Sequence, residues 1–180
     1  MRDISNFVTH GSWGDVVVTD PCTTLVPQGV ARELELRFPN SRLPLATDSD
    51  EENRRFAAER GNSCLAIARA DFDGNGRSDI ALILPTKDGA GYRLVVVLGG
   101  SGGFDVRDLG AWKGSVRTLY VDVAPAGTYR HTEAYPFRPE SGVAEMIVSP
   151  HQGFYFGKAE SAADVYFLEG ARWRRVHVAD

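Results

Sequence analysis

Hydrophobic residues follow a helical period only in the first third of the chain. Val30, Leu34 and Phe38 recur every four residues and would form one apolar stripe along a helix. Pro27 stands where the first turn of a helix tolerates proline, and Pro39 cannot continue the run. The pattern therefore predicts an amphipathic helix between these two prolines.

A second helix is predicted in the segment that ends at Gly61. Ser49 and Glu52 have the spacing of a capping box, in which two side chains satisfy backbone N–H groups at a helix start. Glu51 can pair with Arg54 or Arg55 one turn later, and Gly61 suits the position that follows a helix. We interpret the acidic residues around Ser49 as favourable charge at a helix N-terminus and not as a metal site.

After Gly61 the pattern changes to short β-branched or aromatic runs, separated by clusters of Gly, Pro, Asp and Asn, and this predicts strands. The expected strands are Leu65–Ala70, Asp79–Leu84, Tyr92–Leu98, Val116–Val123, Ala144–Val148, Gly153–Phe156, Asp164–Leu168 and Arg172–Val178. Helices first and strands afterwards indicate an α+β, mostly β fold, with an antiparallel sheet preceded by two short helices. Residues 1–180 are predicted to form a single β-rich domain, with residues 1–61 as its partly helical N-terminal segment.

Composition and charge narrow the classes of function. The 20 Lys and Arg residues against 24 Asp and Glu residues give a net charge of −4, which lacks the basic surface that nucleic-acid binding requires. No apolar run approaches the roughly 20 residues that span a bilayer. Met1–Asn6 lacks the basic start of an export signal. Cys22 and Cys64 permit one disulfide or two free thiols, and the sequence leaves both alternatives open.

The most specific motif runs from Asp71 to Asp79 with the pattern D-x-D-x-N-G-x-x-D. Calcium takes about six to eight oxygen ligands, and a compact loop supplies them from alternate positions around a sharp turn. Asp71, Asp73 and Asn75 hold alternate positions, the carbonyl group of Arg77 can add an oxygen, and Asp79 closes the ring. We therefore predict a Ca²⁺ site at these five residues; the alternative is a polar turn that binds nothing.

Strand-like segments on both sides indicate that this loop joins two strands and not two helices. The stretch Ala70–Ala81, together with Tyr92–Leu98 and Gly99–Phe104, resembles the FG-GAP or VCBS type of repeat, the integrin-type calcium hairpin of β-propeller blades. The resemblance implies a calcium-binding hairpin, although one copy cannot form a propeller by itself. The whole arrangement is loosely similar to small bacterial FG-GAP-like proteins, which include exported lipoproteins and immunity proteins that inhibit a secreted cell-wall hydrolase.

No convincing catalytic constellation emerges, so we expect the protein not to be an enzyme. Gly99–Gly103 matches G-x-S-x-G, but no helical pattern follows, and a nucleophile elbow needs a strand-turn-helix context. The histidines are scattered without metal-ligand spacing and are interpreted as surface or half-buried residues. They are His10, His131, His151 and His177.

The segment Pro125–Ser141 is long for a loop of a compact domain. It contains aromatic and basic residues of the kinds that dominate protein interfaces. These are Tyr129, Arg130, His131, Tyr135, Phe137 and Arg138. We predict that they contact a protein partner; the alternative is that the aromatic side chains fold back as a lid on the core.

These inferences together favour a calcium-stabilised, non-catalytic binding protein. The loose resemblance implies an immunity protein or inhibitor of a secreted bacterial effector such as a peptidoglycan hydrolase. The alternatives are an accessory domain of a calcium-dependent hydrolase and a structural or adhesive surface module. A calcium site with few carboxylates suits a compartment rich in calcium, so we expect a periplasmic or extracytoplasmic location, with a cytoplasmic one as the alternative.

Overall fold

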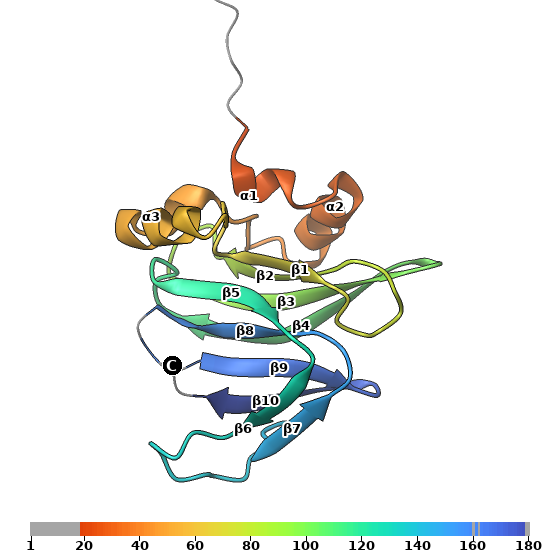
Figure 1. Ribbon diagram of the computed structural model, residues 1–180. Helices are drawn as coiled ribbons and strands as arrows, with labels where there is room; N and C mark the ends of the chain where they lie inside the picture. Colours follow the sequence, from red (N-terminus) through yellow and green to blue (C-terminus); the bar gives the residue numbers. More distant parts are fainter. Residues whose placement is uncertain (1–18, 160, 162, 179–180) are drawn as a thin grey trace, which may run out of the picture.

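Helices precede strands along the chain, and the strands dominate, which confirms the predicted α+β, mostly β class. The computed structural model describes residues 19–159, 161 and 163–178 (Figure 1). Met1–Asn6 and His10, to which two of the sequence predictions apply, lie outside these residues. In the described part of the chain no helix has both the length and the apolar character needed to cross a bilayer.

Both predicted helices form, and two short helical turns accompany them. The helical elements are α1 (Pro21–Thr24), α2 (Gln28–Arg37), a 3-10 turn (Ala46–Asp48) and α3 (Glu51–Glu59). Helix α2 starts directly after Pro27 and buries Val30 and Leu34, as the hydrophobic period predicts. Val30 and Leu34 thus have the positions predicted for the apolar stripe, whereas Phe38 follows the last helical residue and packs, partly buried, against the same cluster.

The predicted capping box of α3 is wrong by one residue. Asp50, and not Ser49, caps the helix, because its carboxylate accepts a hydrogen bond from the Asn53 N–H group at 2.9 Å. Ser49 is buried, and its own N–H group donates to the carbonyl oxygen of Ala46 in the preceding turn. Gly61 does end the helix as predicted, with a positive φ of 76° that favours glycine.

Within the described residues, the strands form two four-stranded antiparallel sheets and one two-stranded hairpin. The first sheet has the order β1-β2-β3-β4 and contains β1 (Ile67–Ala70), β2 (Asp79–Pro85), β3 (Gly91–Gly100) and β4 (Gly103–Lys113). The second has the order β10-β9-β8-β5 and contains β5 (Leu119–Ala124), β8 (Gly153–Lys158), β9 (Ala163–Glu169) and β10 (Arg172–Val178). The hairpin pairs β6 (Gly127–Arg130) with β7 (Met146–Ser149).

Two of these strands were not predicted. Strand β4 forms the outer edge of the first sheet, and Val106 is its one fully buried side chain, so the segment has no regular apolar alternation. Strand β6 lies within Pro125–Ser141, which the sequence analysis treats as a loop without secondary structure. Strand β4 pairs with β3, and β6 pairs with β7. The local sequence does not reveal these backbone hydrogen-bond partners.

The molecule is layered, with helices, first sheet, second sheet and hairpin in succession (Figure 1). Helix α2 covers one face of the first sheet, where Val30 and Leu34 join Leu82 in a cluster of buried side chains. The opposite face of this sheet packs on the second sheet, where Val96 meets Phe154 within a second cluster. Strands β2 and β3 are thus covered on both faces, which explains their nearly continuous apolar sequences.

The β6-β7 hairpin covers the outer face of the second sheet. Tyr129 of β6 and Ile147 of β7 pack against a buried cluster that includes Val165, Phe167 and Val176 of β9 and β10. Part of the segment predicted as a partner loop therefore packs against the hydrophobic interior.

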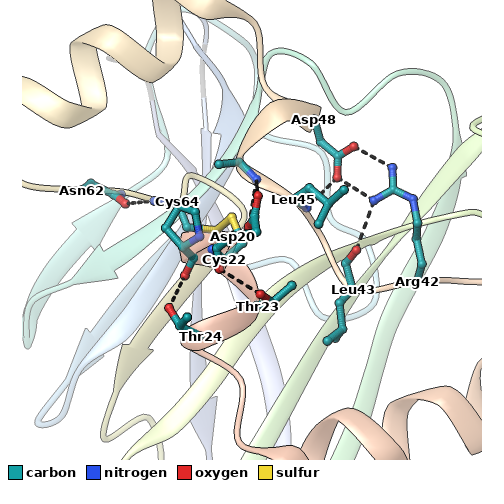
Figure 2. Close-up of a disulfide and its surroundings, with 12 residues drawn as sticks. Asp20, Cys22, Thr23, Thr24, Arg42, Leu43, Leu45, Asp48, Asn62 and Cys64 are labelled. Carbon is teal, nitrogen blue, oxygen red and sulfur yellow. Dashed lines mark hydrogen bonds and ion pairs between the residues drawn. A yellow bond between two sulfur atoms is a disulfide. The ribbon is translucent and has the colours of Figure 1, made fainter. Parts of the chain in front are cut away.

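A disulfide between Cys22 and Cys64 resolves the alternative that the sequence leaves open. It joins α1 to the segment that precedes β1, and each cysteine is only 1% exposed. Asp20 accepts hydrogen bonds from the N–H group of Cys22 at 2.9 Å and from that of Ala46 at 3.0 Å, while Asn62 accepts one from Cys64 at 2.9 Å (Figure 2). The disulfide and these hydrogen bonds fix the helical N-terminal segment to the first sheet.

Candidate metal centre

The predicted calcium loop connects β1 to β2, as its strand-like flanks indicate. The two strands are antiparallel, and Ala70 pairs with Asp79 at their ends, so residues 71–78 close directly on a strand pair. Gly74 and Gly76 have φ values of 74° and 81°, which a residue with a side chain rarely adopts. The glycines of the motif therefore permit the tight reversal that gathers the acidic side chains.

Three carboxylate groups converge in this loop. Asp71, Asp73 and Asp79 each offer an oxygen atom, and these three oxygens lie within 4.8 Å of one another. Asp79 is fully buried, whereas Asp71 and Asp73 are partly exposed at the surface. The three residues could hold a metal ion together, and the oxygen ligands favour a hard cation over a soft one.

Backbone N–H groups of the loop hold the two outer carboxylates in place. Asp71 accepts hydrogen bonds from Asn75 at 3.0 Å and from Gly76 at 2.8 Å. Asp73 accepts one from the same N–H group of Asn75 at 3.0 Å. Backbone N–H groups of their own loop thus anchor both outer carboxylates.

Asn75 and Arg77 take part in the organisation of the loop. The Asn75 side-chain amide donates to Asp73 at 2.8 Å and to the carbonyl oxygen of Gly99 at 3.0 Å. Its oxygen accepts the N–H group of Arg77 at 2.8 Å. Their predicted roles as calcium ligands, through a side-chain and a carbonyl oxygen, stay predictions.

Asp79 connects the loop to the neighbouring hairpin. Its two carboxylate oxygens accept hydrogen bonds from the N–H groups of Phe72 at 2.7 Å and Gly99 at 2.8 Å. Phe72 is fully buried and its ring packs against that of Phe154, with centroids 5.4 Å apart. The carboxylate of Asp79 is therefore part of the fold as well as of the acidic cluster.

The pKa values of Asp79 and Asp71 are shifted in opposite directions. Burial raises the pKa of Asp79, and the nearby negative charges of Asp73 and Asp71 add to this effect, against the two N–H donors that lower it. Burial also acts to raise the pKa of Asp71, but hydrogen bonds from the loop backbone outweigh it and bring this pKa below its ordinary value. Carboxylates held this close repel one another when they are ionised, and a bound cation would reduce this repulsion.

The residues predicted to contact a partner lie in different environments. Tyr129 points inward, with its ring 5.1 Å from that of Phe167 and its hydroxyl donating to Pro125 at 2.9 Å. Burial raises its pKa to about 12. Tyr135, in contrast, is 59% exposed. The lid alternative describes Tyr129 well, while Tyr135 remains open to contact; the partner itself stays a prediction.

The structure brings three further residues beside Pro125–Ser141, the segment predicted to contact a partner. His131, Tyr135 and Arg138 line a cleft together with Asp164, Arg175 and His177 of β9 and β10. Sequence reasoning missed the last three, because no local spacing relates them to a loop more than twenty positions away.

The G-x-S-x-G match at Gly99–Gly103 lies in the β3-β4 hairpin. Strand β4 begins at Gly103, so the helix that a nucleophile elbow requires does not follow. Gly99 instead serves the acidic loop, because it binds both Asp79 and Asn75.

Comparison of the chain with known protein families, with curated protein sequences and with solved structures finds no significant match.

Proposed function

We propose that this protein is a calcium-stabilised, non-catalytic binding protein. The observation that carries the proposal is the convergence of the Asp71, Asp73 and Asp79 carboxylates within 4.8 Å, on a D-x-D-x-N-G-x-x-D loop between antiparallel strands. Calcium is the cation that best suits oxygen ligands on a flexible loop, since magnesium demands a stricter octahedron. The resemblance to FG-GAP and VCBS hairpins supports the same ion.

The ion would serve structure and not chemistry. The proposed carboxylate ligands already accept hydrogen bonds from backbone groups of the loop or of the neighbouring hairpin, so they are placed to order the backbone. Calcium bound there would join β1, β2 and the β3-β4 hairpin at one end of the first sheet.

The proposed partner is a secreted bacterial effector, and a peptidoglycan hydrolase is the specific candidate. The loose resemblance to hydrolase inhibitors of the immunity type supports this class. Exposed Tyr135 and the basic Arg138 offer side chains of the kinds that form interface hot spots. The Cys22–Cys64 disulfide favours an oxidising, extracytoplasmic compartment, where both calcium and such effectors occur.

Calcium should stabilise the protein more strongly as the pH rises. Because burial raises the pKa of Asp79, the folded metal-free protein keeps this proton to a higher pH than the unfolded chain. The unfolding free energy of the metal-free protein therefore falls as the pH rises from about 3.9, the pKa of an Asp in the unfolded chain, through the raised pKa of folded Asp79. Calcium needs the ionised carboxylate, so bound calcium removes this loss of stability. Melting curves with and without calcium, from about pH 4 to about pH 7, should diverge.

Hydrogen bonds from the loop backbone lower the pKa of Asp71, whereas burial raises that of Asp79, so Asp71 ionises at a lower pH than Asp79. A calcium-induced change in melting temperature that stays constant over the whole range would contradict the assignment of Asp79 as a ligand.

Inhibition of cell-wall hydrolysis tests the proposed partner class. Calcium-loaded protein is mixed with muramidases, amidases and endopeptidases, and the clearing of a peptidoglycan suspension is recorded. We expect stoichiometric inhibition of at least one class. The double variant Tyr135→Ala/Arg138→Ala should raise the half-inhibitory concentration by at least about tenfold, as loss of a hot spot does. Leu36→Ala, which removes a 71% exposed side chain from α2, is the matched control and should inhibit normally.

Two outcomes would overturn the proposal. Clearing of the suspension by the protein alone would identify a hydrolytic activity, and unimpaired hydrolysis by every class would exclude this type of partner. Calcium stabilisation without any inhibition would favour the alternative of a structural or accessory module.

A further inference from the structure

A cleft of about 350 Å³ lies between the segment that follows β6 and residues of β9 and β10. Its lining combines imidazole, phenol, guanidinium and carboxylate groups. The residues are His131, Tyr135, Pro136, Arg138, Glu140, Val143, Asp164, Arg175 and His177. None of them belongs to the acidic loop, so the cleft is a separate site.

The two imidazole rings of this cleft are held close together. The ring centroids of His131 and His177 lie 5.9 Å apart. The backbone fixes this proximity, because the N–H group of Thr132, next to His131, donates to the carbonyl oxygen of His177 at 2.9 Å. Phe137 packs edge-on against His131 at 5.4 Å, and Tyr135 against His177 at 5.9 Å. Both rings are therefore restrained by packing as well as by the backbone.

Both rings engage the same nitrogen, Nδ1, with an oxygen atom of the protein. Nδ1 of His131 lies 2.7 Å from the carbonyl oxygen of Thr132, and Nδ1 of His177 lies 3.0 Å from Oδ1 of Asp164. A carbonyl or carboxylate oxygen can only accept a hydrogen bond, so each Nδ1 carries the proton. In the neutral rings both Nε2 atoms are then left with a free lone pair.

The hydrogen bond at Nδ1 is a kind of support that metal-binding histidines have. A ligating imidazole almost always donates its other N–H group to a carboxylate or a backbone carbonyl, which fixes the tautomer and raises its basicity. His177 has the carboxylate form of this support and His131 has the carbonyl form. Asp164 is itself held by an ion pair with Arg175, so the support is ordered.

We propose that His131 and His177 bind a divalent transition-metal ion, with zinc as the representative, through their Nε2 atoms. Zinc–nitrogen bonds of about 2.0–2.1 Å at a tetrahedral angle put two imidazole centroids roughly 5 Å apart. The observed 5.9 Å lies within about an ångström of that spacing, which small side-chain rotations can close. Imidazole nitrogen selects zinc, copper or nickel and not calcium, so the site is chemically distinct from the acidic loop.

Water would complete the coordination shell. Among the described residues, the acidic loop is the one place where three or more His, Cys, Asp or Glu ligand atoms already converge. The cleft thus supplies two protein ligands and leaves positions open to solvent, which predicts binding in the micromolar range or weaker and a metal that exchanges freely.

Titration calorimetry of the untagged, calcium-saturated protein with zinc chloride tests the site. We expect one zinc ion per chain, and at least about tenfold weaker binding after His131→Ala or His177→Ala, since loss of even a supporting residue costs about 10- to 100-fold. His151→Ala is the matched control, because Nδ1 of His151 also lies near a carbonyl oxygen, that of Gln152 at 3.0 Å. That variant should bind zinc like the wild type.

Imidazole ¹⁵N chemical shifts of the wild-type protein provide a second readout that does not depend on the folding of any variant. Zinc should shift the Nε2 signals of both His131 and His177 and leave those of His151 unchanged. The proposal is overturned if zinc does not bind, if both variants bind as tightly as the wild type, or if calcium competes and Asp71→Ala abolishes binding. The last result would place zinc in the acidic loop.

Discussion

Calcium is expected to raise the melting temperature of this protein by about 5 to 11 °C when its concentration is about 100 times the dissociation constant. A ligand that binds only the folded state stabilises it by about 2.7 kcal/mol at that ratio. For a chain of this length about 1 kcal/mol corresponds to a shift of about 2–4 °C. The physical reason is the relief of repulsion among three carboxylates whose oxygens lie within 4.8 Å.

The variant Asp71→Ala/Asp73→Ala should lose this gain. Differential scanning calorimetry with chelator and with excess calcium measures it directly, and magnesium at equal concentration should give a smaller shift. Asp88→Ala is the matched control, because Asp88 also caps a turn, where it accepts the N–H group of Ala90 at 3.0 Å, yet lies outside the acidic cluster. It should keep the full calcium response. Superimposable melting curves of the wild type with chelator and with calcium would refute the site.

Asp79→Ala should behave differently from the other two substitutions. Asp79 accepts hydrogen bonds from Phe72 and Gly99 in addition to its place in the cluster. Its loss leaves the buried N–H group of Phe72 and the partly buried N–H group of Gly99 unpaired, so the variant should be destabilised even in chelator, by a few kcal/mol. The comparison separates the structural role of a carboxylate from its role as a calcium ligand.

Removal of the disulfide is expected to lower the unfolding free energy by about 4 kcal/mol. The bond closes a loop between residues separated by 42 positions, and the loop entropy that it removes from the unfolded chain has this magnitude. The variant Cys22→Ala/Cys64→Ala should accordingly melt about 8–16 °C below the oxidised wild type. Urea unfolding followed by tryptophan fluorescence or circular dichroism gives the free energy itself.

The reductant dithiothreitol supplies the control for this prediction. It should destabilise the wild type and leave the double alanine variant unchanged, because that variant has no bond to reduce. Both cysteines are 1% exposed, so reduction should become fast only once the chain opens. Equal unfolding free energies for the oxidised wild type and the double variant would contradict a stabilising role for the bond.

The disulfide and the acidic loop lie on either side of β1. Cys64 precedes this short strand and Asp71 follows it. Just before β1, the carbonyl oxygen of Leu65 accepts a hydrogen bond from the N–H group of Val121 in β5 at 2.8 Å, so this edge of the first sheet meets the second sheet. A strand of four residues gains little stability from its own pairing. The disulfide on one side and the acidic loop on the other hold β1 in place where the two sheets meet.

The sequence alone determined the features that depend on nearby residues. The four-residue apolar period defined α2, and the glycine at Gly61 defined the end of α3. The spacing of Asp71, Asp73 and Asp79 defined the acidic cluster, because a tight loop brings such positions together whatever the rest of the chain does. The position of the α3 cap was predicted one residue too early, since neighbouring Ser and Asp residues are equally good caps.

Tertiary structure alone decided the rest. Strand β4 is polar and exists because β3 supplies its hydrogen-bond partners. The pairing of Cys22 with Cys64 depends on how α1 docks against the first sheet. The paired imidazoles arise because the β6-β7 hairpin folds over β10 and brings His131 to His177, far apart in the sequence. Local spacing encodes short loops and helix faces, whereas contacts between distant segments depend on packing of the whole chain.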